Sequence, residues 1–141
     1  MPYNLNLNNF EQLIDTRILE RGFGIYKSDL ILSIEQIDKG IWEAIVQGSE
    51  DYEVTVQVAS SGNIMSTYCD CPYNMGDYCK HEVAIFNFLK YSKEAKKSSS
   101  NKMQRIRNIL DTFTKEDLKE NLLFILKNNR EVRNEFLEEN E

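Results

Sequence analysis

The sequence predicts a mixed α+β fold, in which a small antiparallel β-sheet is flanked by helical segments. Three observations lead to this expectation. Apolar residues recur at helical spacing before residue 22 and after residue 80, whereas they alternate with polar residues between positions 29 and 69. Short, turn-rich breaks divide the alternating region into separate runs. All three cysteines and the only histidine of the 141-residue chain fall within residues 69–81.

Residues 8–22 predict an N-terminal helix. Asn8 and Glu11 fit a start of the capping-box kind, and Gly22 fits a C-terminal cap. The apolar residues that share one stripe at helical spacing are Phe10, Leu13, Ile14, Ile18 and Leu19. We therefore expect a single helix that ends near Gly22.

The next region, residues 29–69, predicts four strands. Polar and apolar residues alternate clearly in the first three runs and more weakly in the fourth, NIMSTYC. The alternating apolar positions are Leu30, Leu32 and Ile34, then Trp42, Ala44 and Val46, then Tyr52, Val54, Val56 and Val58. The breaks DKG, GSED and SSGN are too short for the crossovers that parallel neighbours need. We therefore expect an antiparallel meander.

Helical spacing returns after the cysteines, and it divides the rest of the chain. Residues 1–91 are expected to hold the first helix, the sheet and a Cys/His segment at 68–91 that ends in a helix. Residues 92–101 are rich in Ser and Lys and predict a linker. Residues 102–141 predict a helical segment of three helices. The apolar residues of the helix after the cysteines are Val83, Ile85, Phe86, Phe88 and Leu89.

Within the C-terminal helical segment, the second helix has the clearest start. Thr114 and Asp117 form a capping pair there. The run LLFIL, residues 122–126, lies inside the same helix. Apolar faces at helical spacing are usually core, so we expect these helices to complete a core, with partner docking as the less favoured interpretation.

The cysteines and histidine form the pattern C-x-C-x7-C-x-H, made by Cys69, Cys71, Cys79 and His81. Residues two apart in a strand point the same way, so the first two sulfurs can reach one point. The second pair opens a helix, whose free N–H groups favour thiolates. Four Cys and His ligands suit a closed, structural zinc site, since a catalytic zinc keeps one position open.

Two other interpretations of the cluster stay open at this point. The cysteines could be core residues beside an incidental histidine, although chance rarely gathers every Cys and His at paired spacing. They could also form a redox pair, although redox motifs usually read C-x-x-C near a βαβ unit, which this sequence lacks.

Composition narrows the possible functions. No cysteine or histidine remains outside the cluster for acid–base or nucleophilic chemistry, so we expect neither an enzyme nor a small-molecule substrate. An odd number of cysteines fits a secreted disulfide framework poorly. No apolar run approaches the roughly 18 residues of a membrane helix. The start, MPYNLNLNNFEQ, lacks a signal sequence, so we expect a cytoplasmic protein without membrane contact.

The cysteine–histidine pattern resembles the signature of the SWIM zinc finger, which occurs in Swi/Snf-type ATPases. The stretch CDCPYNMGDYCKHEVAIFNFL is similar to the bacterial form, with Pro72 after the second cysteine and Gly76 in the loop. Upstream, RGFGIYKSDLI and the V-x-G-S-x-x-Y-x-V run of residues 46–54 resemble the segment that precedes the motif in many bacterial members. The resemblance covers roughly residues 20–91.

This resemblance implies a zinc-bound ββα-like module that mediates DNA or protein contacts. In bacteria the module often lies at the N-terminus of a Swi/Snf-type DNA translocase. The phosphate-binding pattern GxxxxGK[ST] of such a motor does not occur in this chain. The chain is therefore either a stand-alone SWIM protein or the leading part of a larger one.

Charge is distributed unevenly along the chain. The net charge of −6 argues against nonspecific coating of nucleic acid, but residues 90–107 carry seven Lys or Arg and one Glu, a net charge of +6. These residues could contact phosphates: Lys90, Lys93, Lys96, Lys97, Lys102, Arg105 and Arg107. Tyr68, Tyr73 and Tyr78 could stack on exposed bases.

Two kinds of partner follow from this distribution. Without the resemblance, a solvated linker would be the favoured interpretation of the basic run. With it, we expect DNA or a DNA-associated protein complex as the partner. The alternative is a protein–protein interaction module, with an acidic sheet surface and no direct nucleic-acid contact.

Overall fold

The computed structural model describes residues 5–73, 75–97 and 101–141. The chain divides into two compact units, Met1–Met103 and Gln104–Glu141. The first unit contains a four-stranded sheet and the helices that cover it, and the second consists of helices. The predicted α+β fold is therefore confirmed. No helix of the described part of the chain is long and apolar enough to cross a membrane.

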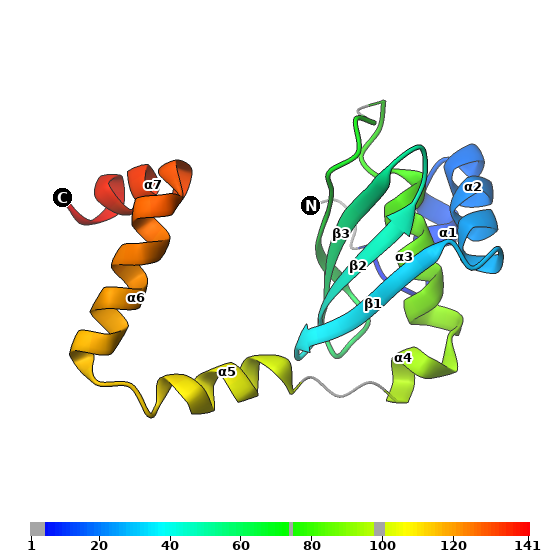
Figure 1. Cartoon of the computed structure of the whole chain (residues 1–141). Coiled ribbons are helices and arrows are strands. Elements are labelled where there is room, and N and C mark those ends of the chain that lie inside the picture. Colours follow the sequence, from blue (N-terminus) through cyan, green and yellow to red (C-terminus); the bar gives the residue numbers. More distant parts are fainter. Residues whose placement is uncertain (1–4, 74, 98–100) are drawn as a thin grey trace. The chain divides into compact units, whose positions relative to one another are not determined.

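The sheet is an antiparallel meander in which each strand pairs with the next along the chain, as predicted. Figure 1 shows α3 passing behind this sheet with α2 beside it. Alternate residues of the two central strands face these helices, and the opposite face is open. The strands are β1 (Ile31–Asp38), β2 (Ile41–Gln47), β3 (Asp51–Val58) and β4 (Ile64–Cys69). The buried residues of β2 and β3 are Trp42, Ala44, Val46, Tyr52, Val54 and Val56.

Strand β1 departs from the simple alternation that the sequence suggests. Ile31 pairs with Val46 and Ser33 pairs with Ile45, so Leu32 is an extra residue in the ladder. Such a β-bulge shifts the alternation of side chains by one position. Leu32 is consequently 50% exposed, whereas Ile31 and Ile34 pack against the core. The prediction that Leu32 faces the core was wrong.

The N-terminal helix is also different from the prediction, because it is broken in two. Helix α1 (Phe10–Leu13) ends at Ile14, whose backbone is extended. Asp15 then caps α2 (Thr16–Lys27) by accepting a hydrogen bond from the Arg17 N–H at 2.8 Å. No side-chain hydrogen bond caps α1, so the expected Asn8–Glu11 box is absent.

Gly22 lies inside α2 and does not end it. A Cβ atom at this position would collide with the Val83 side chain and lie 3.0 Å from the Lys80 carbonyl oxygen. The missing side chain therefore lets α2 approach α3 closely. Gly24 lies two residues further along α2 and has open space around it, so only one of the two glycines is needed for packing.

Helix α3 (Lys80–Tyr91) forms where the apolar residues predicted a helix, and it is the centre of the first unit. Every residue from His81 to Asn87 is buried, because α2 lies on one side of the helix and the sheet on the other. The Phe86 ring meets Phe10 edge-on, with ring centroids 5.5 Å apart. A short helix, α4 (Lys93–Lys97), follows within the predicted linker, whose residues 98–100 lie outside the described part.

The C-terminal helices are α5 (Lys102–Leu110), α6 (Lys115–Asn128) and α7 (Arg130–Asn140). Thr114 and Asp117 form the predicted capping box at the start of α6. None of the residues of these three helices is buried. Among their described residues these helices therefore form no core of their own.

Candidate metal centre

The first two cysteines lie at the end of the last strand. Cys69 is the final residue of β4 and pairs with Val54 of β3. Asp70 extends this pairing by one step, because its N–H donates to the Glu53 carbonyl at 3.2 Å and its carboxylate accepts from the Glu53 N–H at 3.0 Å. These bonds hold the strand end against β3 just before Cys71, so the position of the Cys69–Cys71 step is fixed by the sheet.

The other two residues of the cluster come from the start of α3. Cys79 is the N-cap residue, and its sulfur accepts a hydrogen bond from the Glu82 N–H at 3.4 Å. His81 lies in the first turn of the same helix and is 4% exposed. The helix N-terminus therefore directs the Glu82 N–H toward the sulfur, as the sequence led us to expect, and this one hydrogen bond acts to lower the pKa of the Cys79 thiol.

All four predicted residues meet at one point. The candidate ligand atoms of Cys69, Cys71, Cys79 and His81 all lie within 4.8 Å of one another. The His81 Nδ1 atom is 3.7 Å from the Cys69 sulfur and 3.8 Å from the Cys79 sulfur. Around a tetrahedral zinc with ordinary bond lengths, a nitrogen and a sulfur ligand are about 3.5 Å apart. The cluster therefore has the donor set and nearly the dimensions of a closed zinc site.

The His81 ring packs against Tyr52 and lies close to Gly48. The Tyr52 ring packs against it with centroids 4.8 Å apart, and the Tyr52 hydroxyl bonds to Ser49 at 2.7 Å. A Cβ atom on Gly48 would lie 3.1 Å from His81 Nε2, so the glycine leaves room for the ring. Nε2 is buried and has no hydrogen-bond partner among the described residues. With Nδ1 facing the sulfurs, Nε2 is the nitrogen that would carry the proton when a metal is bound.

The electrostatics of the cluster differ with and without a bound cation. The neighbouring Cys69 thiol, and then burial, raises the pKa of the Cys79 thiol, and burial raises the pKa of the Cys71 thiol. Without a metal, these two sulfurs therefore favour the protonated form at neutral pH. A Zn²⁺ ion reverses this preference, because its charge stabilises coordinating thiolates. Two cations, Arg21 and Lys80, line a cavity of about 390 Å³ beside the cluster and reduce the remaining negative charge.

One residue of the site was missed in the sequence. Glu82 is 7% exposed, and its two carboxylate oxygens accept hydrogen bonds from the Cys79 N–H and from the Thr67 hydroxyl, both at 2.8 Å. It therefore connects the helix that carries two cluster residues to the strand that carries a third. A capping-box pattern, with Cys in place of Ser or Thr and Glu three residues later, is the signal that could have identified it.

The basic residues proposed for nucleic-acid contact have different surroundings. Lys90 forms an ion pair with Glu11 and lies 5.4 Å from the centroid of the Phe10 ring. Lys102 bonds to Glu35 at 2.6 Å. The other five are all exposed, and within the described part of the chain no ion pair involves four of them, Lys93, Lys96, Lys97 and Arg105; the fifth is Arg107.

The three tyrosines near the cluster differ in how far their rings are exposed to solvent. Tyr68 is 63% exposed and Tyr73 is 38% exposed, so both offer a ring face to solvent. Tyr78 is half-buried and packs edge-on against Phe86, with centroids 6.0 Å apart. The expectation that Tyr78 is a free stacking surface was therefore wrong, because its ring belongs to the packing around α3.

Comparison with known families agrees with the geometry of this site. Residues 52–90 match the family model of the SWIM zinc finger, a family of binding modules that use zinc. The match extends from β3 into the end of α3 and includes the whole cluster. Neither a curated protein nor a solved structure gives a significant match to the chain. The segment from residue 52 to residue 90, with its converging cysteines and histidine, is therefore similar to the SWIM zinc finger in both sequence and donor set.

Proposed function

We propose that one zinc ion, held by Cys69, Cys71, Cys79 and His81, stabilises a module that binds DNA or a DNA-associated complex. The observation that carries this proposal is the basic segment, residues 90–107, which begins at the end of the finger helix. Its seven Lys or Arg residues and one Glu give it a net charge of +6 in a chain whose net charge is −6. A positively charged segment of this kind can bind the phosphate groups of nucleic acid.

The surroundings of the basic residues support the same proposal. Three lysines of α4 are exposed and make no ion pair with a described residue: Lys93, Lys96 and Lys97. Tyr68 and Tyr73 flank the cysteines and present exposed rings on which bases can stack. Phosphate contacts with sequence-tolerant stacking would give binding that depends strongly on salt and weakly on sequence.

The experiment is a salt titration of DNA binding by fluorescence anisotropy, with the zinc-loaded chain and a labelled duplex. The double variant Lys96→Glu, Lys97→Glu is compared with a control, Lys119→Glu, Lys127→Glu, which changes the charge equally on exposed positions of α6. Each lost phosphate contact lowers the salt slope by about 0.9. We expect a slope reduced by about 2 in the first variant only, with unchanged zinc content. Equal binding by both double variants would contradict the proposal.

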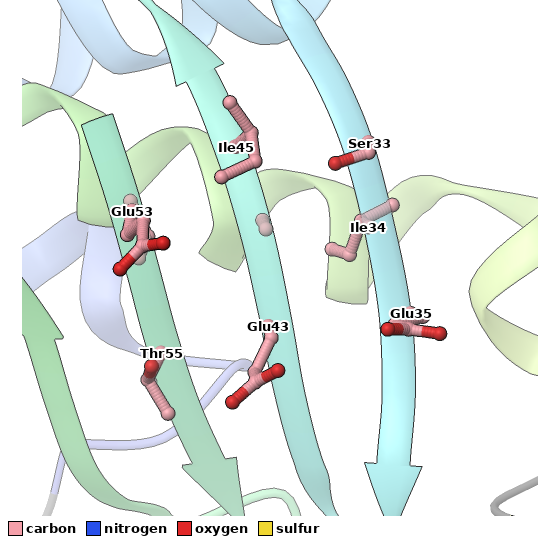
Figure 2. A pocket seen from close by; sticks show the side chains of 9 residues that line it. Ser33, Ile34, Glu35, Glu43, Ile45, Glu53 and Thr55 are labelled. Carbon is pink, nitrogen blue, oxygen red and sulfur yellow. The ribbon is translucent and has the colours of Figure 1, made fainter. Parts of the chain in front are cut away.

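A second candidate function is protein docking without nucleic-acid contact, and the open face of the sheet favours it. Figure 2 shows Glu35 of β1, Glu43 of β2 and Glu53 of β3 on this face, and Ile45 lies on the same strand as Glu43. A shallow groove of about 500 Å³ follows this surface. Glu35 and Glu43 are direct partners across β1 and β2, a like-charge pairing that costs stability. The bond from Lys102 to Glu35 offsets part of that cost, and a basic partner would offset the rest.

This alternative is separated from the first by the double variant Glu43→Lys, Glu53→Lys. If the sheet face is the functional surface, the variant loses a basic protein partner in a binding assay, and neither the variant nor the wild type binds DNA. If the basic segment is the functional surface, the variant binds DNA at least as tightly as the wild type, because repulsion of phosphates is reduced.

The proposal also covers the cellular location of the module and the protein with which it acts. We place it in the cytoplasm, where thiols stay reduced, as a noncatalytic partner of a bacterial Swi/Snf-type DNA translocase. The support is the resemblance of the finger to those found with such motors. The test is to add the zinc-loaded chain to a translocase of this class and to measure DNA-stimulated ATP hydrolysis. A rate that does not respond to the chain at saturating concentration would contradict this part of the proposal.

A further inference from the structure

The second unit is made of helices that expose their apolar residues. Phe124 is 69% exposed and Ile109 is 56% exposed, and no residue of α5, α6 or α7 is buried. The large apolar residues exposed on these helices are Ile106, Ile109, Leu110, Leu118, Leu122, Leu123, Phe124, Ile125, Val132, Phe136 and Leu137. A surface of this kind on a folded protein marks an interaction site.

The lengths of the helices lead to the same conclusion. They contain 9, 14 and 11 residues. Isolated helices shorter than about 12–15 residues are marginal in water, because nucleation costs more than a few hydrogen bonds return. Stable helices of this length therefore need their apolar faces covered. The covering surface must be as extensive as the exposed face itself.

The apolar pattern of α6 indicates the kind of surface that covers it. Leu118, Leu122 and Ile125 follow one another at spacings of four and three residues. This is the spacing of the seam along which two helices pack with side chains interlocked. The three residues are 42–52% exposed, so the seam is present but lacks its partner helix among the described residues.

The charges on either side of α6 are opposite. Helix α5 carries no acidic residue and three basic ones, of which Lys102 bonds to Glu35 while Arg105 and Arg107 lie in the second unit. Helix α7 begins with Arg130 and Arg133 but carries four glutamates, three of them after residue 134, so its net charge is −2. When two copies of α6 run antiparallel, the end that leads to α5 in one copy lies beside the end that leads to α7 in the other. A twofold axis through α6 therefore pairs basic with acidic segments twice.

From this pattern we infer that the second unit is a homodimerisation element, in which α6 packs antiparallel against α6 of a second copy of the chain. The seam Leu118, Leu122 and Ile125 provides the apolar contact, and the α5–α7 pairs set the antiparallel orientation. A parallel pair would place basic beside basic and acidic beside acidic segments, which repel. The inference does not depend on DNA binding.

The first test is the mass of the full, zinc-loaded chain by sedimentation as a function of concentration. We expect twice the 16.5 kDa of one chain at high concentration. The double variant Leu122→Glu, Ile125→Glu should be monomeric with unchanged zinc content. Lys127→Glu is the matched control, because it also changes the net charge by −2 but lies on the opposite side of α6 from the seam; it should stay dimeric. A wild-type chain that is monomeric at all concentrations would overturn the inference.

The second test uses charge reversal. One variant carries Arg105→Glu and Arg107→Glu, and the other carries Glu138→Lys and Glu139→Lys. Each alone should shift the monomer–dimer midpoint to higher concentration, because α5 and α7 of the two copies then have like charges. Mixed together, the two variants should form a mixed dimer, visible by native mass spectrometry, in which both contacts are attractive again. Absence of the mixed dimer would show that the helices are covered by something other than a second copy.

Discussion

Glu82 of α3 accepts a hydrogen bond from the hydroxyl of Thr67 in β4 at a distance of 2.8 Å. The other oxygen of the same carboxylate accepts from the Cys79 N–H, also at 2.8 Å. The two elements that carry the cluster are thus joined by one buried side chain. Both bonds lie within three residues of a cluster cysteine, so their geometry is part of the geometry of the metal centre.

Replacing Glu82 by Ala should loosen this connection without removing a candidate ligand. The buried Cys79 N–H and the half-buried Thr67 hydroxyl lose their acceptor, at a cost of about 1–3 kcal/mol for the buried group left unpaired. Residues that orient ligands typically affect metal affinity by about 10–100-fold. We expect a weaker zinc affinity in competition with a chelator. Thr67→Val removes only one of the two bonds and should have the smaller effect; a normal affinity in Glu82→Ala would exclude this positioning role.

Loss of a cluster residue should have a much larger effect. In Cys71→Ser or His81→Ala, we expect the first unit to lose zinc and to lose cooperative unfolding, because structural zinc contributes on the order of 10 kcal/mol of folding free energy. Metal content and thermal unfolding by circular dichroism measure this directly. Met75→Ser is the control from the same loop, since that side chain is 84% exposed. Full zinc content with an unchanged melting curve in either ligand variant would contradict the assignment.

The two glycines of α2 should respond oppositely to the same substitution. In Gly22→Ala the new methyl group meets Val83, so overpacking should cost about 1–3 kcal/mol of unfolding free energy. In Gly24→Ala the methyl group meets open space, and the gain in helix propensity should stabilise the protein by about 0.5–1 kcal/mol. Urea denaturation of the two variants measures the difference. Equal effects would show that the close approach of α2 to α3 is not needed.

Zinc binding should release protons. The pKa values of the Cys71 and Cys79 thiols are raised in the absence of metal, so both are protonated at pH 7 and must lose their protons to coordinate zinc. We expect at least two protons released per zinc, and an affinity that rises with pH and falls on acidification. Calorimetry at pH 7 in buffers of different ionisation enthalpy gives the number. Zinc binding without proton release would mean that these sulfurs are already thiolates or do not bind.

Some differences between sequence and structure have a local cause that periodicity does not contain. Leu32 continues an alternating pattern, yet a bulge at that position turns its side chain to solvent. Gly22 looks like a helix end, yet it lies inside α2 because α3 crosses close to it. In both cases the decisive contact is with a residue of another element. A local sequence pattern reflects the conformational preference of a residue, but it does not specify which residue of another element will contact it.

The sequence by itself determined the antiparallel meander, the helix after the cysteines and the four cluster residues, because turn length, strand period and the donor chemistry of Cys and His are local properties. Only the tertiary structure decided which nitrogen of His81 faces the sulfurs, and that Glu82 connects α3 to β4. It also left the apolar residues of α5–α7 uncovered. Burial and distance between segments that are far apart in the chain depend on how the elements pack, and no local pattern specifies that packing.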